Sequence, residues 1–171
     1  AGSIDVKPRT SLVPQDQLVR FYFPRSMDMP SQKLGDAAFD LPTAESYVLK
    51  HGPNIIDTKL SIHFPPGVKG HLKMRSGLSF KRDIWISLQG GVLDNGYRGN
   101  VHIMVFVHRI AVNGVEVPEI PISVGERLFQ IEPEAMPGYV VPGPLALEYC
   151  VGAAPTDTAR GTAGFHSTGQ A

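Results

Sequence analysis

The stretch that decides the fold is "DIWISLQGGVLDNGYRGNVHIMVFV", residues 83–107. Its two ends, 83–88 and 101–107, are rich in β-branched and aromatic residues, as is typical of strands. Between them, Asp94-Asn95-Gly96 is a strong signal for a tight β-hairpin turn. The sequence therefore predicts two antiparallel strands joined at residues 94–96.

The turn leaves three neighbouring residues unexplained. Asp94, Tyr97 and Arg98 place an acid, a phenol and a guanidinium on one turn. Together with exposed backbone N–H and C=O groups, such a turn can hold a planar ligand that forms hydrogen bonds. The hairpin is thus a candidate binding site as well as a structural element.

The rest of the chain repeats this pattern of short strands and frequent turns. Further strand-like runs lie at 18–23, 59–64, 127–132 and 145–150, and the run 59–64 alternates cleanly between apolar and polar residues. The other segments are expected to be a short helix at 76–83, a turn at 64–70, an exposed excursion at 113–121 and, at 132–144, a stretch too rich in proline for a central strand. This pattern predicts one all-β domain, a sandwich or a barrel.

Composition limits the possible functions. The chain has 171 residues, with 16 Lys plus Arg and 16 Asp plus Glu, so its formal net charge is zero. This balance gives no simple argument for a nucleic acid or membrane partner, although a few local cations could bind phosphate. Cys150 is the only cysteine, which excludes an intrachain disulfide. A single cysteine agrees with an intracellular location, and the sequence does not distinguish cytoplasm from nucleus. No apolar run approaches the roughly 18 residues of a membrane span.

Common catalytic patterns are absent from the sequence. It contains neither GxxxxGK[ST] nor GxGxxG, and its six histidines show no HExxH spacing. With one cysteine, a closed zinc site is unfavourable. His166 and Ser167 are adjacent, but "GFHSTG" is not the GxSxG pattern of a serine hydrolase.

Two other polar clusters could bind an anion. "MRSGL" (74–78) offers the Arg75 guanidinium, the Ser76 hydroxyl and close backbone approach at Gly77, although for the tripeptide alone a helix N-cap with a solvated arginine is the better explanation. "RGTAGFHSTGQA" (160–171) cannot pack into a core. It is either a disordered tail or a flexible clamp for a phosphorylated aromatic ligand.

Five short motifs occur in the order found in the trimeric dUTPase family, which the chain resembles over roughly residues 18–170. The motifs are "AAFDL" (37–41), "RSGL" (75–78), "GVLDNGYRG" (91–99), "GERLFQ" (125–130) and "RGTAGFHSTG" (160–169). Two residues depart from the family pattern, because Ala163 and His166 stand where the family usually has glycine. The segment 108–122 is longer than the family loop, which suggests a surface insertion and is compatible with a viral member.

The resemblance implies a fold, an assembly and an activity. The fold is a distorted antiparallel jelly roll (β-clip) over residues 1–159, with 1–17 as an N-terminal extension. The subunit forms a homotrimer with active sites at subunit interfaces, and the arm 160–171 closes over the site of another subunit. The activity is hydrolysis of dUTP to dUMP and pyrophosphate with Mg²⁺.

The resemblance also implies roles for individual residues. Asp94 activates the water that attacks the α-phosphorus, and Tyr97 packs against the deoxyribose, leaving no space for a 2′-OH. The hairpin backbone from 92 to 104 reads the uracil, with contacts at Gly91, Val92, Leu93, Asn100, His102 and Met104. The phosphates are held by Arg75, Ser76, Gly77 and Gln130, and by Arg160, His166, Ser167 and Thr168 of the arm, whose Phe165 covers the base. Asp40 supports the waters of Mg²⁺.

Two alternatives remain. A dCTP deaminase shares the fold, but it carries a catalytic Glu where this chain has Met104 and usually a Phe where it has Tyr97. A dUTPase-like interaction module without catalysis should have lost some site residues, yet Asp94, Tyr97, Gln130 and Arg160 are all present. Both comparisons favour the hydrolase.

Overall fold

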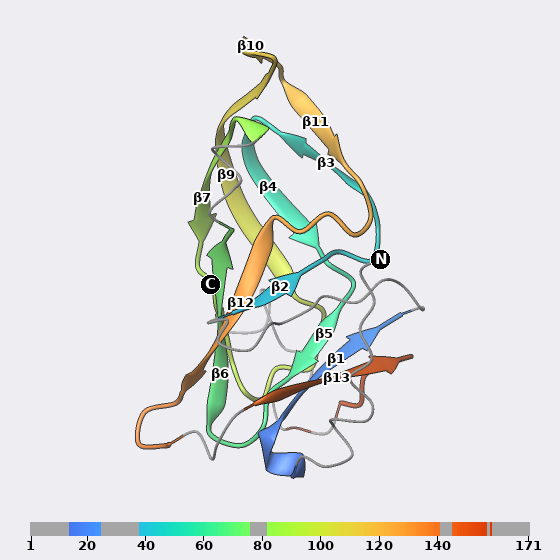
Figure 1. Cartoon of the computed structure of the whole chain (residues 1–171), viewed down its shortest axis with the longest axis vertical. Coiled ribbons are helices and arrows are strands. Elements are labelled where there is room, and N and C mark those ends of the chain that lie inside the picture. The colour runs from blue at the N-terminus through green and yellow to red at the C-terminus, as the bar shows by residue number, and fades with distance from the viewer. Residues whose placement is uncertain (1–13, 25–37, 76–81, 141–144, 157, 159–171) are drawn as a thin grey trace, which may run out of the picture.

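The structure is a computed structural model that describes residues 14–24, 38–75, 82–140, 145–156 and 158 (Figure 1). Within these residues it contains a 3-10 helix, η1 (Gln15–Gln17), and thirteen strands. The strands are β1 (Leu18–Phe23), β2 (Phe39–Leu41), β3 (Tyr47–Lys50), β4 (Gly52–Asp57), β5 (Ser61–His63), β6 (Val68–Met74), β7 (Ile84–Gln89), β8 (Val92–Leu93), β9 (His102–Val112), β10 (Val115–Glu116), β11 (Glu119–Ile122), β12 (Phe129–Ala135) and β13 (Ala146–Val151). The all-β prediction is confirmed. The helix predicted at 76–83 falls largely on residues outside this description.

Four small sheets share one hydrophobic core. Their strand orders are β13-β1-β5, β2-β12-β6-β8, β11-β3 and β10-β9-β4, with β7 also paired to β9. Figure 1 shows β4, β7 and β9 with the β3–β11 pair at one end of the molecule and β1, β13 and β5 at the other. The largest fully buried side chains, among them Phe21, Phe23, Phe39 and Phe129, come from strands of two different sheets. In the described part of the chain, no helix has the length and apolarity needed to cross a membrane.

One strand pair is parallel, whereas the prediction was antiparallel throughout. β1 and β13 run in the same direction, in register from Leu18 with Ala146 to Phe23 with Val151. Parallel neighbours need a long crossover, and here nearly the whole chain lies between the two strands. The parallel pair therefore adds no strain to a connection.

The tight hairpin predicted at residues 94–96 is wrong, although the two strands that it was meant to join do pair. The antiparallel β7–β9 ladder ends at Gln89 opposite Met104. The chain then leaves β9, and β8 pairs with β6 instead. Gly90 and Gly91 adopt φ angles of 69° and 117°, which glycine allows at little cost, and so redirect the chain.

Asn95 does not form the predicted hairpin turn, and its side chain makes tertiary hydrogen bonds instead. Neither it nor Gly96 is among the residues of the described chain with positive φ, which a type I′ turn requires at both central positions. Instead, the Asn95 side-chain amide donates to the carbonyls of Pro65 and Val68, both at 2.8 Å. Asn95 therefore fixes the turn between β5 and β6 to the loop that follows β8.

The true two-residue hairpin lies in the segment predicted as an exposed excursion, 113–121. Asn113 and Gly114 have φ angles of 52° and 79°, and Val112 pairs with Val115 across them. The chain then continues into β11, which pairs with β3. The longer segment 108–122 is mostly exposed, as predicted for an insertion, but it extends the sheets instead of forming an irregular loop.

Two further expectations need correction. The run 59–64 does not alternate in burial, because Ser61 and His63 are buried as well as Leu60, Ile62 and Phe64. Ser61 and His63 are hydrogen-bonded to each other, and Tyr22 packs on the His63 ring. Within the proline-rich segment 132–144, β12 continues to Ala135 through Pro133. This is possible because β2 pairs with β12 only as far as Ile131, so Pro133 has a ladder on one side alone.

Candidate active site

The sheet β2-β12-β6-β8 brings together two of the predicted phosphate-binding residues, Arg75 and Gln130, and the predicted metal-supporting residue Asp40. Asp40 on β2 and Gln130 on β12 are register partners. Arg75 directly follows β6, and its Nε lies 3.3 Å from Asp40 Oδ1. The Gln130 amide donates to the Met74 carbonyl at 3.2 Å, next to Arg75. The three side chains therefore meet at one end of this sheet.

Arg127 belongs to the same cluster, and the sequence analysis missed it. Its Nη1 lies 3.8 Å from Asp40 Oδ2, and its carbonyl accepts a hydrogen bond from the Arg75 guanidinium at 2.9 Å. Asp40 thus lies between two guanidinium groups, the residue type best suited to binding phosphate oxygens. The signal was present in the motif "GERLFQ", of which only Gln130 was considered.

A second group of predicted residues lies around the loop that joins β8 to β9. The β7–β9 ladder ends at Met104. At His102 and Ile103, β9 therefore still pairs with β4 but no longer with β7. The turn of chain at Gly90 and Gly91 opens this gap.

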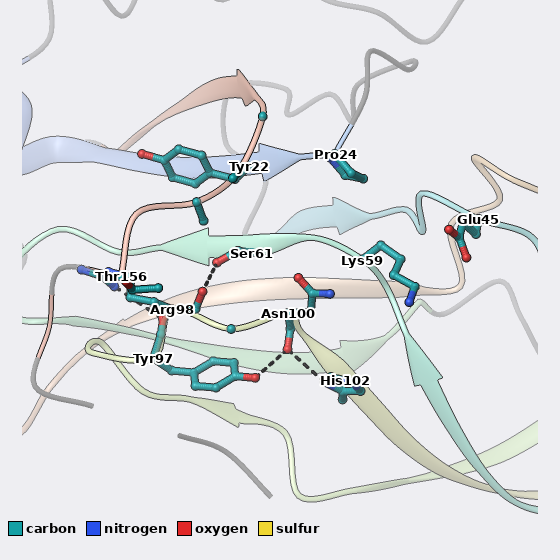
Figure 2. Close-up of a pocket in the computed structure, with 14 residues that line it drawn as sticks. Tyr22, Pro24, Glu45, Lys59, Ser61, Tyr97, Arg98, Asn100, His102 and Thr156 are labelled. Carbon is teal, nitrogen blue, oxygen red and sulfur yellow. Dashed lines mark hydrogen bonds between the residues drawn. The ribbon is translucent and has the colours of Figure 1, made fainter. Parts of the chain in front are cut away.

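Tyr97, Asn100 and His102 line a cavity of about 780 Å³ (Figure 2). The Tyr97 hydroxyl donates to the Asn100 carbonyl at 2.8 Å, which holds the ring in place. Gly99 makes this possible, because a Cβ there would lie 2.4 Å from the Tyr97 hydroxyl oxygen. The other lining residues are Tyr22, Pro24, Glu45, Lys59, Ser61, Arg98, Gly99, Gly152, Ala153, Ala154 and Thr156.

Asp94 is exposed and follows β8 directly. The Tyr97 amide donates to the Asp94 carbonyl at 3.2 Å, which closes the turn between them. The Thr158 hydroxyl donates to the Gly96 carbonyl, so the chain that leads into the C-terminal arm reaches this same turn. Ser76 and Gly77, and the arm residues Arg160, Phe165, His166, Ser167 and Thr168, lie outside the described residues.

The two groups of residues do not converge within one chain. Leu93, which precedes Asp94, pairs with Gly70 on β6. Arg75 lies five residues further along the same strand direction, which is about 16 Å at the rise of a β-strand. The cavity that contains Tyr97 is lined by neither Asp40, Arg75 nor Gln130. One chain therefore carries a loop half, around Asp94 and Tyr97, and a separate arginine half, around Arg75 and Arg127.

The carboxylates do not form a ready-made metal site. Among the described residues there is no cluster of three His, Cys, Asp or Glu side chains that could hold a metal ion. The Asp40 carboxylate faces the two guanidinium groups. A carboxylate paired in this way could support a hydrated cation only through the waters of that cation.

The fold and the divided site define a class: an all-β protein with two arginines beside Asp40 and a separate cavity lined by Tyr97. Comparison with known proteins identifies the family. The dUTPase family model matches residues 25–131, more than half of the chain. The chain belongs to the dUTPase family, as its five motifs suggested.

Individual relatives agree with this assignment. The mitochondrial deoxyuridine 5′-triphosphate nucleotidohydrolase of Dictyostelium discoideum is 35% identical over 136 residues, covering 79% of this chain and 66% of that protein. The enzyme of the same name from Rhizobium meliloti is 30% identical over 170 residues, covering 94% and 95%. Among solved structures, a mutant dUTPase of phage phi11 of S. aureus, in which a structural Mg(II) ion is coordinated, has a TM-score of 0.57 at 22% identity and covers 73% of this chain and 95% of its own.

Proposed function

We propose that this chain is a dUTP diphosphatase, which hydrolyses dUTP to dUMP and pyrophosphate. Family membership supports the reaction, and the observation that carries it to this chain is the Tyr97 pocket beside Asp94. Tyr97 is held over a cavity by its hydrogen bond to Asn100, while Asp94 stays exposed on the same turn. A nucleoside in the pocket would therefore place its 5′-phosphates near the exposed Asp94 carboxylate.

The pocket accounts for the choice of nucleoside. In this proposal the Tyr97 ring, held by its hydrogen bond to Asn100, packs against the deoxyribose and leaves no room for a 2′-OH. The open backbone beside His102 and Ile103, with Gly91, Val92 and Leu93 across the gap, supplies donors and acceptors for the uracil edge. Backbone groups offer a fixed pattern that a 5-methyl group would disturb.

Asp94 is the general base in this mechanism. It accepts a proton from the attacking water, whose oxygen bonds to the α-phosphorus while the bond from this phosphorus to the bridging oxygen breaks. Pyrophosphate leaves with the electron pair. The guanidinium groups of Arg75 and Arg127 and the Gln130 amide bind the charged oxygens that develop. Bound Mg²⁺, with Asp40 supporting its waters, would offset further negative charge.

The active unit in this proposal is a homotrimer with sites between subunits. The loop half and the arginine half are about 16 Å apart along β6, so one chain does not gather both around a single triphosphate. A closed cyclic assembly brings the loop half of one subunit to the arginine half of the next. The arm 160–171 is expected to close over this shared site, and Thr158 places its root beside the Gly96 turn.

The direct test is pyrophosphate release from dUTP, dCTP, dTTP and UTP, each with and without Mg²⁺. We expect strong preference for dUTP and dependence on the metal. Comparable turnover of UTP would contradict the role of Tyr97. Ammonia release from dCTP would indicate a deaminase, and no reaction with any of the four would leave an interaction module as the better interpretation.

A further inference from the structure

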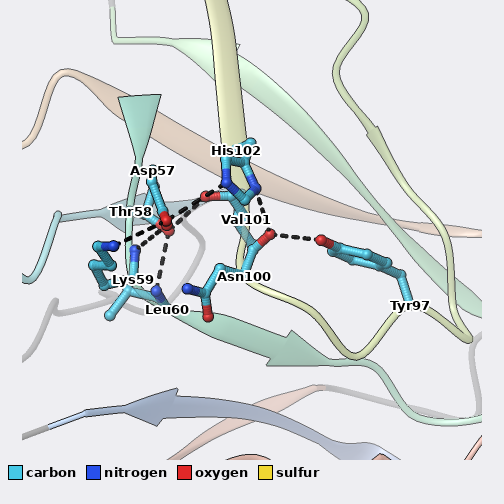
Figure 3. Close-up of polar contacts among 8 residues, drawn as sticks. All are labelled: Asp57, Thr58, Lys59, Leu60, Tyr97, Asn100, Val101 and His102. Carbon is cyan, nitrogen blue, oxygen red and sulfur yellow. Dashed lines mark hydrogen bonds and ion pairs between the residues drawn. The ribbon is translucent and has the colours of Figure 1, made fainter. Parts of the chain in front are cut away.

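A chain of polar contacts connects β4 to the Tyr97 ring (Figure 3). Asp57 and His102 are register partners on β4 and β9, and His102 Nε2 lies 3.5 Å from Asp57 Oδ2. The other ring nitrogen, Nδ1, lies 3.0 Å from the Asn100 carbonyl oxygen. That same oxygen accepts the hydrogen bond from the Tyr97 hydroxyl at 2.8 Å.

Both partners of the His102 ring are oxygen atoms of acceptor groups. A backbone carbonyl and an ionised carboxylate can only accept hydrogen bonds. Both ring nitrogens can therefore donate only when the imidazole carries two protons and a positive charge. A neutral ring that keeps Nδ1–H toward Asn100 would turn the lone pair of Nε2 toward the Asp57 carboxylate.

Asp57 is itself held in place. Its Oδ1 accepts a hydrogen bond from the Lys59 amide at 2.8 Å, and the Lys59 ammonium lies 3.2 Å from its Oδ2. Burial alone would raise the pKa of Asp57, but the Lys59 hydrogen bonds and the charges of His102 and Lys59 outweigh it and hold this pKa below its ordinary value. The carboxylate is thus a fixed negative charge opposite His102.

The backbone beside this link is hydrogen-bonded to the segment that directly follows β4. The amide and the hydroxyl of Thr58 both donate to the Val101 carbonyl, at 3.0 and 2.8 Å. The Val101 amide donates to the Leu60 carbonyl at 2.7 Å. The Asp57–His102 pair adds a further contact, because the His102 ring also lies against the Asn100 carbonyl. This carbonyl accepts the hydrogen bond from the Tyr97 hydroxyl.

We propose that Asp57 and His102 are positioning residues for the nucleoside pocket. The His102 ring, held beside Asp57, fixes the Asn100 carbonyl, and this carbonyl fixes the Tyr97 ring against the deoxyribose. The inference rests on the proposed function, since it assigns the Tyr97 pocket to deoxyuridine. It predicts that nucleotide affinity depends on the contact between the His102 ring and the Asp57 carboxylate. The other charged groups near the ring are Lys59 beside Asp57 and, on the walls of the cavity, Glu45 and Arg98.

Asp57→Asn tests the link sharply. The asparagine keeps an oxygen that accepts from the Lys59 amide, so the turn is preserved, while the negative charge is lost. The matched control is Asp83→Asn, which breaks the Asp83–Arg109 ion pair of 3.1 Å between the start of β7 and the far part of β9. Asparagine also tolerates the positive φ of 50° at position 83.

Full-length wild type and both variants are assayed with dUTP and Mg²⁺ at pH 7. We expect the KM of Asp57→Asn to rise about threefold, the effect of a partly exposed ion pair, with kcat within about twofold of wild type. The double variant Asp57→Asn/His102→Gln is no worse than Asp57→Asn alone, because the two act through one link. A KM for Asp57→Asn equal to that of Asp83→Asn, or fully additive effects, would overturn the inference.

A second measurement does not depend on hydrolysis. The ¹⁵N resonances of the His102 ring in the unliganded full-length protein report whether one or both nitrogens are protonated. We expect the ring resonances of Asp57→Asn to differ from those of wild type and of Asp83→Asn, because the Asp57 carboxylate no longer lies beside Nε2. Identical ring resonances in Asp57→Asn and wild type would overturn the link, whereas altered resonances without dUTP hydrolysis would contradict the proposed function alone.

Discussion

Gly99 shows how one residue without a side chain supports the pocket. The Tyr97 hydroxyl crosses back to the Asn100 carbonyl, and a Cβ at position 99 would lie 2.6 Å from the ring carbon Cζ and closer still to the hydroxyl oxygen. Gly99 does not have a positive φ angle, so backbone conformation does not require glycine there. What requires glycine is the space occupied by the Tyr97 ring. The same argument makes Gly99 a sensitive probe of the Tyr97 position.

Gly99→Ala should displace the Tyr97 ring and lower kcat/KM for dUTP by at least about tenfold, which corresponds to roughly 1.4 kcal/mol. Discrimination against UTP should weaken as well, because the ring no longer occupies the space of the 2′-OH. Steady-state kinetics with both nucleotides provide the measurement, and thermal unfolding checks that the fold is kept. An unchanged preference for dUTP would separate Tyr97 from sugar selection.

Asp57 and Asp83 make folding stability depend on pH in the acid range. The pKa of each carboxyl is below its ordinary value. For Asp83 the chief cause is the hydrogen bond from the Arg109 guanidinium. For Asp57, burial raises the pKa, but the contacts with Lys59 and His102 lower it by more. A lowered folded-state pKa adds stability above the unfolded-state value of about 3.8, and this stability is lost as pH falls through the folded-state pKa. Urea unfolding should show the wild type losing more stability between pH 6 and pH 3 than Asp83→Asn loses. Equal losses would mean that the Asp83–Arg109 pair does not contribute.

At the scale of elements, the sequence predicts the strands well and their connections poorly. The pairing of β7 with β9 follows from two apolar runs, but hydrophobic pattern alone cannot show that Gly90 and Gly91 turn the chain toward β6. Two Asn-Gly pairs are present, at 95–96 and 113–114, and only the second forms the tight hairpin. Tertiary hydrogen bonds from the Asn95 amide decide between them, and no local propensity records these bonds.

Asn95→Gly distinguishes the two roles of Asn95. Glycine suits a type I′ turn, so a turn residue would tolerate this change. As a clamp, Asn95 satisfies the carbonyls of Pro65 and Val68, and its loss should cost about 1–3 kcal/mol of unfolding free energy. Denaturant titration measures the difference, and Asn113→Gly at the true hairpin provides the control, which is expected to be nearly neutral. Equal stability of the two variants would restore the turn interpretation.

At the scale of the whole molecule, the motifs identify the parts of the site but not their distribution. Sequence order gives no indication that Arg75 and Asp94 are attached to opposite ends of β6; the register of β6 with β8 shows it. Arg127 was likewise out of reach, because its place beside Asp40 depends on the pairing of β12 with β2. The clamping role of the arm 160–171 stays a prediction, since those residues lie outside the described structure.

The central claim is that dUTP is hydrolysed at a site shared between subunits, in a trimer of about 56 kDa built from chains of 18.6 kDa. Two variants, each inactive by itself, test it: Asp94→Asn damages the loop half, and Arg75→Ala damages the arginine half. Native mass spectrometry first confirms that mixing the two exchanges their subunits. Pyrophosphate release from dUTP is then measured on the mixture. The account predicts that activity reappears, because some mixed sites combine an intact Asp94 from one subunit with an intact Arg75 from another. Mixed trimers that remain as inactive as their parents would show that each subunit completes its own site and would contradict the account.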